Sequence, residues 1–134
     1  MKGRFIGELH NGWLPDSDKH AVVDQEFAYI TKNGLKLIVE KGTITDGASI
    51  PWFFRFVFHI APWGKHRRAA VLHDDMYQEG VFTRKQADEV FYEAMLVSGV
   101  SKWRAGLMFA GVRIGGSWAW YKHRWNLSYQ KRRN

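Results

Sequence analysis

The stretch from Ala69 to Met95 most constrains what this chain can fold into, because it has the pattern of two amphipathic helices joined by a very short connection. In the first helix, Ala69, His73 and Tyr77 are spaced four residues apart and share one stripe, while Asp74 falls on the neighbouring stripe. A short connection predicts that the two helices run antiparallel. Ionisable side chains are therefore expected in their contact.

The second helix has a clear start and one acid in its apolar face. Thr83, followed three residues later by Gln86, is a capping box, and Gly80 suits the end of the preceding helix. Asp88 belongs to a face that also contains Ala87, Phe91, Ala94 and Met95. Packing this face on the first helix predicts that Asp88 lies within hydrogen-bond reach of His73.

A buried carboxylate beside a histidine suits general-base chemistry, because it fixes the tautomer and stabilises the imidazolium. Asp74, next to His73, could bind a hard cation, for which Ca²⁺ is favoured over Zn²⁺. Zinc is the alternative, with Asp46 and Asp88 as further donors. A purely structural His73–Asp88 pair explains the pattern equally well.

These residues resemble a known motif. His73-Asp74-x-x-Tyr77, followed by Asp88 on a second helix, is similar to the catalytic motif of the secreted phospholipase A2 superfamily. The resemblance implies that His73 activates water, that Asp88 orients it, that Tyr77 hydrogen-bonds Asp88 and that Asp74 binds calcium. The glycine-rich calcium loop of that superfamily is not matched, so the loop containing Asp46 is its candidate replacement.

A second resemblance covers about two thirds of the chain. It is carried by Thr45–Pro51, Ala69–Asp74, Arg84, Ala87-Asp88 and Phe91, which resemble a family of short phage and prophage proteins catalogued as domain of unknown function 1353. This resemblance implies a phage or prophage origin. It also implies virion proteins or further copies of the chain as partners.

Composition limits the remaining choices. With 134 residues, the chain is expected to form a single domain, 1–134, and without cysteine it has no disulfide or thiolate metal site. The net charge of +7 favours an anionic partner. Because the start lacks the apolar region of a signal peptide, we expect synthesis in the host cytoplasm, with incorporation in the virion as a further possibility.

The predicted fold class is α+β, with a small N-terminal antiparallel sheet packed on the helix pair and a long third helix behind. Asn33-Gly34 predicts a hairpin between residues 27–31 and 35–39. Residues 5–20 are expected to form a short strand and then a loop, and a further loop is expected from Lys41 to Trp52. The third helix is expected from about Lys102 to Tyr121, and because Arg113 interrupts its apolar middle, a transmembrane span is not expected.

Cations and aromatic residues gather before the first helix and after the third. They are candidates for contact with anionic lipid, with a partner protein or, less favoured, with nucleic acid. The alternative is a solvated tail that docks its tryptophans on the body. The candidates are Lys65, Arg67, Arg68, Trp120, Arg124, Trp125 and Arg132.

Three functions follow from these patterns. The first is a phospholipase A2-like enzyme that hydrolyses lipid esters at the host envelope. The second is a catalytically silent virion protein of the tail or capsid, in which the His73–Asp88 pair is structural. The third is a nucleic-acid-binding phage accessory protein.

Overall fold

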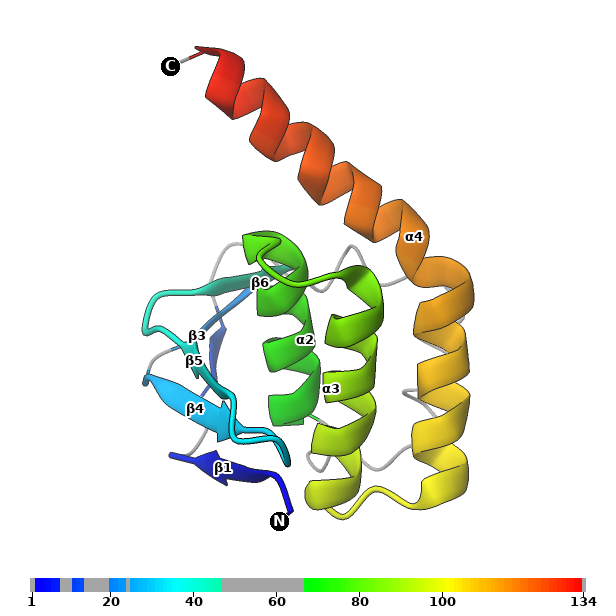
Figure 1. Cartoon of the computed structure of the whole chain (residues 1–134). Coiled ribbons are helices and arrows are strands. Elements are labelled where there is room, and N and C mark those ends of the chain that lie inside the picture. Colours follow the sequence, from blue (N-terminus) through cyan, green and yellow to red (C-terminus); the bar gives the residue numbers. More distant parts are fainter. Residues whose placement is uncertain (1, 8–10, 14–19, 24, 47–66, 134) are drawn as a thin grey trace.

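The computed structural model describes residues 2–7, 11–13, 20–23, 25–46 and 67–133. In these parts of the chain six short strands precede three helices, which confirms the α+β class (Figure 1). The elements are β1 (Arg4–Ile6), β2 (Asn11–Trp13), β3 (His20–Val23), β4 (Phe27–Ile30), β5 (Lys36–Val39), β6 (Ile44–Asp46), α2 (Arg67–Glu79), α3 (Arg84–Val97) and α4 (Lys102–Arg133). Of the loop expected from Lys41 to Trp52, residues 47–52 lie outside the described residues.

The strands form two antiparallel sheets, ordered β1-β4-β5 and β2-β3-β6. The predicted hairpin is confirmed as β4 and β5, with Gly34 in its turn at a φ of 86°. Two loop predictions were wrong: Asn11-Gly12 lies in β2 and Thr45 in β6. Both segments pair with β3, and partners distant in sequence override local turn preference.

A carboxylate joins the first sheet to α3. The Tyr29 hydroxyl donates to Glu93 Oε1 at 2.7 Å, and the Lys32 backbone N–H donates to the same oxygen at 2.9 Å. Gly3 permits this contact, since a Cβ there would lie 2.0 Å from the Tyr29 hydroxyl. The sheet therefore packs at a fixed position on the helix pair.

The helix pair and the first half of α4 form the helical core. The predicted capping box is present, since Gln86 N–H donates to Thr83 Oγ1 at 3.1 Å and Thr83 N–H donates to Gln86 Oε1 at 2.9 Å. In α4 a Cβ at Gly116 would lie 2.8 Å from the Tyr77 hydroxyl, so a glycine is required where α4 approaches α2. Completely buried apolar side chains fill the space between the helices, among them Phe91, Ala94, Met95, Ala105, Met108 and Val112.

The third predicted helix is longer than expected. It starts at Lys102 as predicted but continues to Arg133, and its last part leads away from the helix pair (Figure 1). After Gly116 the sequence contains neither glycine nor proline, so no residue that strongly disfavours a helix ends it at Tyr121. Among the described residues, no helix is both long and apolar enough to cross a membrane.

A second buried acid, Asp75 on α2, is set apart from the candidate site. Burial, with smaller contributions from Glu79 and Glu40, raises the pKa of Asp75 to about 7. In the unfolded chain its pKa returns to about 3.9. The folded state therefore binds this proton more tightly, and stability falls as the pH rises from about 4 through 7.

We expect Asp75→Asn to remove the decrease in folding stability between about pH 4 and pH 7. At pH 8 the variant should be more stable than the wild type by on the order of 1–3 kcal/mol, because the ionised carboxylate is no longer held in the core. Urea unfolding between pH 4 and pH 8 measures the effect, with Glu26→Gln at an exposed position as the control. Parallel pH profiles for the wild type and Asp75→Asn would contradict it.

Candidate functional site

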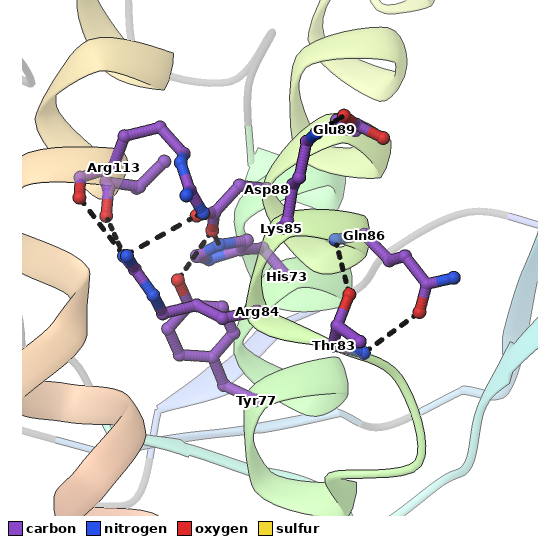
Figure 2. A network of polar contacts seen from close by, with 10 residues as sticks. His73, Tyr77, Thr83, Arg84, Lys85, Gln86, Asp88, Glu89 and Arg113 are labelled. Atoms are coloured by element: carbon purple, nitrogen blue, oxygen red, sulfur yellow. Dashed lines mark hydrogen bonds and ion pairs between the residues drawn. The ribbon is translucent and has the colours of Figure 1, made fainter.

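The site is built on the carboxylate of Asp88, which has no solvent exposure. His73 and Tyr77 stand one turn apart on α2 and both reach the same oxygen from there (Figure 2). His73 Nε2 lies 2.7 Å from Asp88 Oδ1, and the Tyr77 hydroxyl donates to Oδ1 at 2.5 Å. The predicted His73–Asp88 contact and the Tyr77–Asp88 hydrogen bond are therefore both present.

The second carboxylate oxygen faces two arginines. Arg113 of α4 donates from Nη1 to Asp88 Oδ2 at 3.0 Å, and Nη1 of Arg84, one turn before Asp88 on α3, lies 3.8 Å from the same oxygen (Figure 2). Arg84 Nη1 also donates to the backbone carbonyls of Val112 and Arg113, at 3.2 and 3.1 Å. The Asp88 carboxylate thus contacts side chains from all three helices.

These contacts keep Asp88 ionised. Burial alone would raise its pKa, but hydrogen bonds from His73 and Tyr77, the charge of His73 and the hydrogen bond from Arg113 outweigh burial, so the pKa of Asp88 is lowered. The pKa of Tyr77 is raised by its burial and by its hydrogen bond to Asp88, so its hydroxyl stays protonated and donates.

The ionised acid fixes the tautomer of His73. A carboxylate can only accept, so Nε2 carries the proton and, in the neutral ring, Nδ1 carries the lone pair. Among the residues that the structure describes, none hydrogen-bonds Nδ1. The ring packs between Phe91, with centroids 4.6 Å apart, and Tyr77, at 4.2 Å, and its side chain is 12% exposed. His73 is thus a base held in position by Asp88, with a side chain that is partly exposed.

The predicted cation site is only partly described. Asp74 Oδ2 accepts a hydrogen bond from Gln78 Nε2 at 3.0 Å. Asp46 lies in β6 opposite His20, and its side chain is outside the described part of the structure. Within the described residues no three His, Asp or Glu side chains form a metal-binding group, whereas calcium takes about six to eight oxygens. The described residues alone supply too few ligands for the ion, so the divalent cation stays a prediction.

The predicted anion-contacting residues occupy different surroundings. Arg68 lies over the Phe5 ring, 4.4 Å from its centroid, and donates to the Gly7 carbonyl at 3.2 Å. Trp120 packs edge-on against Tyr77, with centroids 5.2 Å apart. Lys65 lies outside the described residues. For Arg67 in α2 and for Arg124, Trp125 and Arg132 in α4, the structure describes the backbone alone.

The sequence interpretation missed the two arginines as members of the site. In the sequence, Arg113 stands out only as a charge that interrupts an apolar segment. Arg84 stands out only as one of the residues that carry the family resemblance. A cation inside a buried helix face needs an anion. Asp88, the single acid of the α3 apolar face, was the available partner.

Comparison with known proteins finds relatives of this chain that have no assigned activity. Uncharacterized protein y4iH of Sinorhizobium fredii is 38% identical over 118 residues, covering 87% of this chain and 49% of the relative. Uncharacterized protein y4jT of the same organism is 32% identical over 117 residues, covering 84% of this chain and 35% of the relative. The chain thus spans half or less of the length of these relatives. No solved structure matches it.

The family match lies on the part of the chain that builds the site. Residues 21–112 match the family described as "Protein of unknown function (DUF1353)". The match includes β4, β5, α2 and α3, and with them His73, Tyr77 and Asp88, and it ends one residue before Arg113. The chain therefore belongs to the DUF1353 family.

Proposed function

We propose that this protein is an ester hydrolase in which His73 is the general base, with phospholipid esters as the substrate class. The observation that carries the proposal is the His73 Nε2–Asp88 Oδ1 contact of 2.7 Å, which leaves Nδ1 as the basic nitrogen. The resemblance to the phospholipase A2 motif supports it, because the contacts implied among His73, Tyr77 and Asp88 are present.

The chemistry follows from the tautomer. Nδ1 of His73 takes a proton from water as the water oxygen attacks the ester carbonyl carbon, and the imidazolium is stabilised by Asp88 through Nε2–H. When the tetrahedral intermediate collapses, the C–O bond to the alcohol breaks and the imidazolium returns its proton to the leaving oxygen. Asp88 remains a carboxylate throughout, since its lowered pKa opposes protonation.

A second candidate is a structural protein without activity. It is favoured by the two arginines, because Arg113 and Arg84 neutralise Asp88 and connect α3 to α4 whether or not His73 takes part in a reaction. The resemblance to phage and prophage proteins supports a virion role for such a protein. The two candidates predict different effects of a His73 substitution on ester hydrolysis.

For the enzyme, we expect His73→Gln to lower the rate of ester hydrolysis by about 10²–10⁴-fold, the usual contribution of a general base. Glutamine can still donate to Asp88 from its amide, so the melting temperature should stay close to that of the wild type. The assay is fatty-acid release from dispersed short-chain phosphatidylcholine. Glu89→Gln, at an exposed position beside Asp88 on α3, is the matched control.

The assay also separates the candidates. Release by the wild type that is lost in His73→Gln and kept in Glu89→Gln supports the hydrolase. Activity that survives in His73→Gln would sink the assignment of the base. If even the wild type releases no fatty acid, with CaCl₂ or with EDTA, the structural candidate stands instead.

For Asp88→Asn we expect lower stability and a changed response to acid. Replacing the ionised member of a buried pair should cost roughly 3–5 kcal/mol at pH 7. Because the pKa of Asp88 is lowered in the folded state, its stabilisation is present above the unfolded value of about 3.9 and is lost as the pH falls through the folded value. Asp88→Asn should therefore lose less stability than the wild type between pH 5 and pH 2.

Urea unfolding across that range measures the change, again with Glu89→Gln as control. Equal acid sensitivity of the wild type and Asp88→Asn would show that Asp88 is not the ionised centre of the network.

The predicted cation is tested separately by binding. Calorimetric titration of the wild type and Asp74→Asn with CaCl₂ should show heat that the substitution weakens, since a carboxylate is the strongest oxygen donor in such a site. Titration with no heat for the wild type would remove calcium from the proposal and leave the His73–Asp88 chemistry unaffected.

A further inference from the structure

The first half of α4 carries apolar side chains on the side turned to solvent. Trp103 is 58% exposed, Leu107 50% and Ile114 81%. With Ala110, which is also exposed, they follow one another at intervals of four, three and four residues, so they form one stripe along the helix. We call this stripe, with its continuation toward the end of the helix, the outer stripe.

The opposite side of the same half is core. Ala105, Met108 and Val112 have no exposure, and Gly116 is buried against Tyr77. The outer stripe therefore points away from α2 and α3. Its large apolar side chains are not explained by packing within the described part of the chain.

The register of the helix extends the outer stripe beyond residue 114. Trp118, Tyr121, Trp125 and Tyr129 take the next positions on it. The repeat is eleven residues, with 103, 114 and 125 equivalent, and this spacing follows an almost straight line along an α-helix.

The positions that continue the core side change character where α4 leaves the helix pair. In the part of α4 that leads away in Figure 1 they are occupied by Ala119, His123, Asn126, Leu127 and Gln130. The core side thus becomes mixed, with polar residues among apolar ones, while the outer stripe stays aromatic.

The charge of the protein is concentrated in the same helix. Of the 20 Lys and Arg residues, eight lie in α4, which contains none of the 13 Asp and Glu, so the rest of the chain has 12 cations and 13 acids. The net charge of +7 is therefore +8 from α4 and −1 from everything else. Beside the outer stripe, the Arg104 guanidinium lies 5.2 Å from the centroid of the Trp103 ring.

We propose that the outer stripe of α4 is a docking surface for an anionic phospholipid bilayer. Trp and Tyr rings favour the headgroup region, Leu107 and Ile114 supply apolar contact, and flanking cations pair with lipid phosphates.

Charge and chemistry favour lipid over the other occupants. A second copy would pair α4 with a helix that has no acid to offer, so like charges would meet. A single-stranded nucleic acid would use the aromatic rings and cations but gives no role to the aliphatic side chains at 107 and 114. The bilayer accounts for all three residue classes.

The docking surface and the candidate site share α4 but lie on opposite sides of it. Trp120 packs on Tyr77, which donates to Asp88, whereas the outer stripe points away from α2 and α3. A bilayer bound to the outer stripe is thus separated by α4 from the site that we propose acts on lipid esters. Docking does not rest on that activity, and it is tested on lipids without an ester bond.

The test is sedimentation of the full chain with vesicles of ether-linked phosphatidylglycerol and, in parallel, ether-linked phosphatidylcholine. We expect binding to the anionic vesicles to exceed binding to the neutral ones by at least about tenfold, and to weaken as NaCl is raised.

Two pairs of variants locate the surface. Trp103→Ser with Ile114→Ser should weaken binding about tenfold or more, whereas Val81→Ser with Leu35→Ser, which are exposed apolar positions in connections away from α4, should not. Lys122→Glu with Arg124→Glu should weaken it at least about tenfold, whereas Lys36→Glu with Lys41→Glu, which gives the same net charge, should have a smaller effect. Circular dichroism checks that each variant is folded.

Several results would overturn the proposal. They are equal binding to neutral and anionic vesicles, no binding to either, or equal losses in the stripe variants and their controls. A dimer in light scattering that the Trp103→Ser, Ile114→Ser variant dissociates, without vesicle binding, would assign the stripe to a second copy. Oligonucleotide binding without vesicle binding would assign it to nucleic acid. Hydrolysis of dispersed ester without vesicle binding would remove docking alone.

Discussion

The arrangement of the three helices depends on one buried charge, the carboxylate of Asp88. An ionised acid in the interior is costly unless donors satisfy both oxygens and a counter-charge lies nearby. Here α2 supplies His73 and Tyr77 to one oxygen, and α4 supplies Arg113 to the other. Moving any of the three helices would leave a partner unmatched, so the carboxylate acts as a geometric constraint as well as an electrostatic one.

The same constraint explains why the site is compatible with both candidate functions. Arg113 and Arg84 already compensate the charge of Asp88, so the fold does not need an imidazolium for charge balance. His73 is then held in one tautomer by a hydrogen bond, with Nδ1 as the basic nitrogen. The 12% exposure of the His73 side chain is the feature that favours chemistry over a purely structural role.

Local sequence patterns predicted the helix pair correctly. They failed where contacts between residues far apart in the sequence determine the structure. The capping box at Thr83 and the apolar face around Asp88 are encoded within single helices, and both appear as expected. Arg113 lies 25 residues after Asp88, and their contact requires the packing of α4 on α3, which no periodicity indicates. β2 and β6 were missed for the same reason, because each is defined by pairing with β3 and not by its own residues.

In its first half, α4 packs one side in the core and exposes the opposite side to solvent. Its inner side is apolar at Ala105, Met108 and Val112, and beyond Gly116 it also includes the polar residues His123, Asn126 and Gln130. The outer stripe does not change at that point, so its composition is set by something other than the core. Gly116 lies where α4 approaches the Tyr77 hydroxyl. Since Arg113 is three residues earlier on the same helix, the Asp88 network fixes the position from which the outer stripe extends.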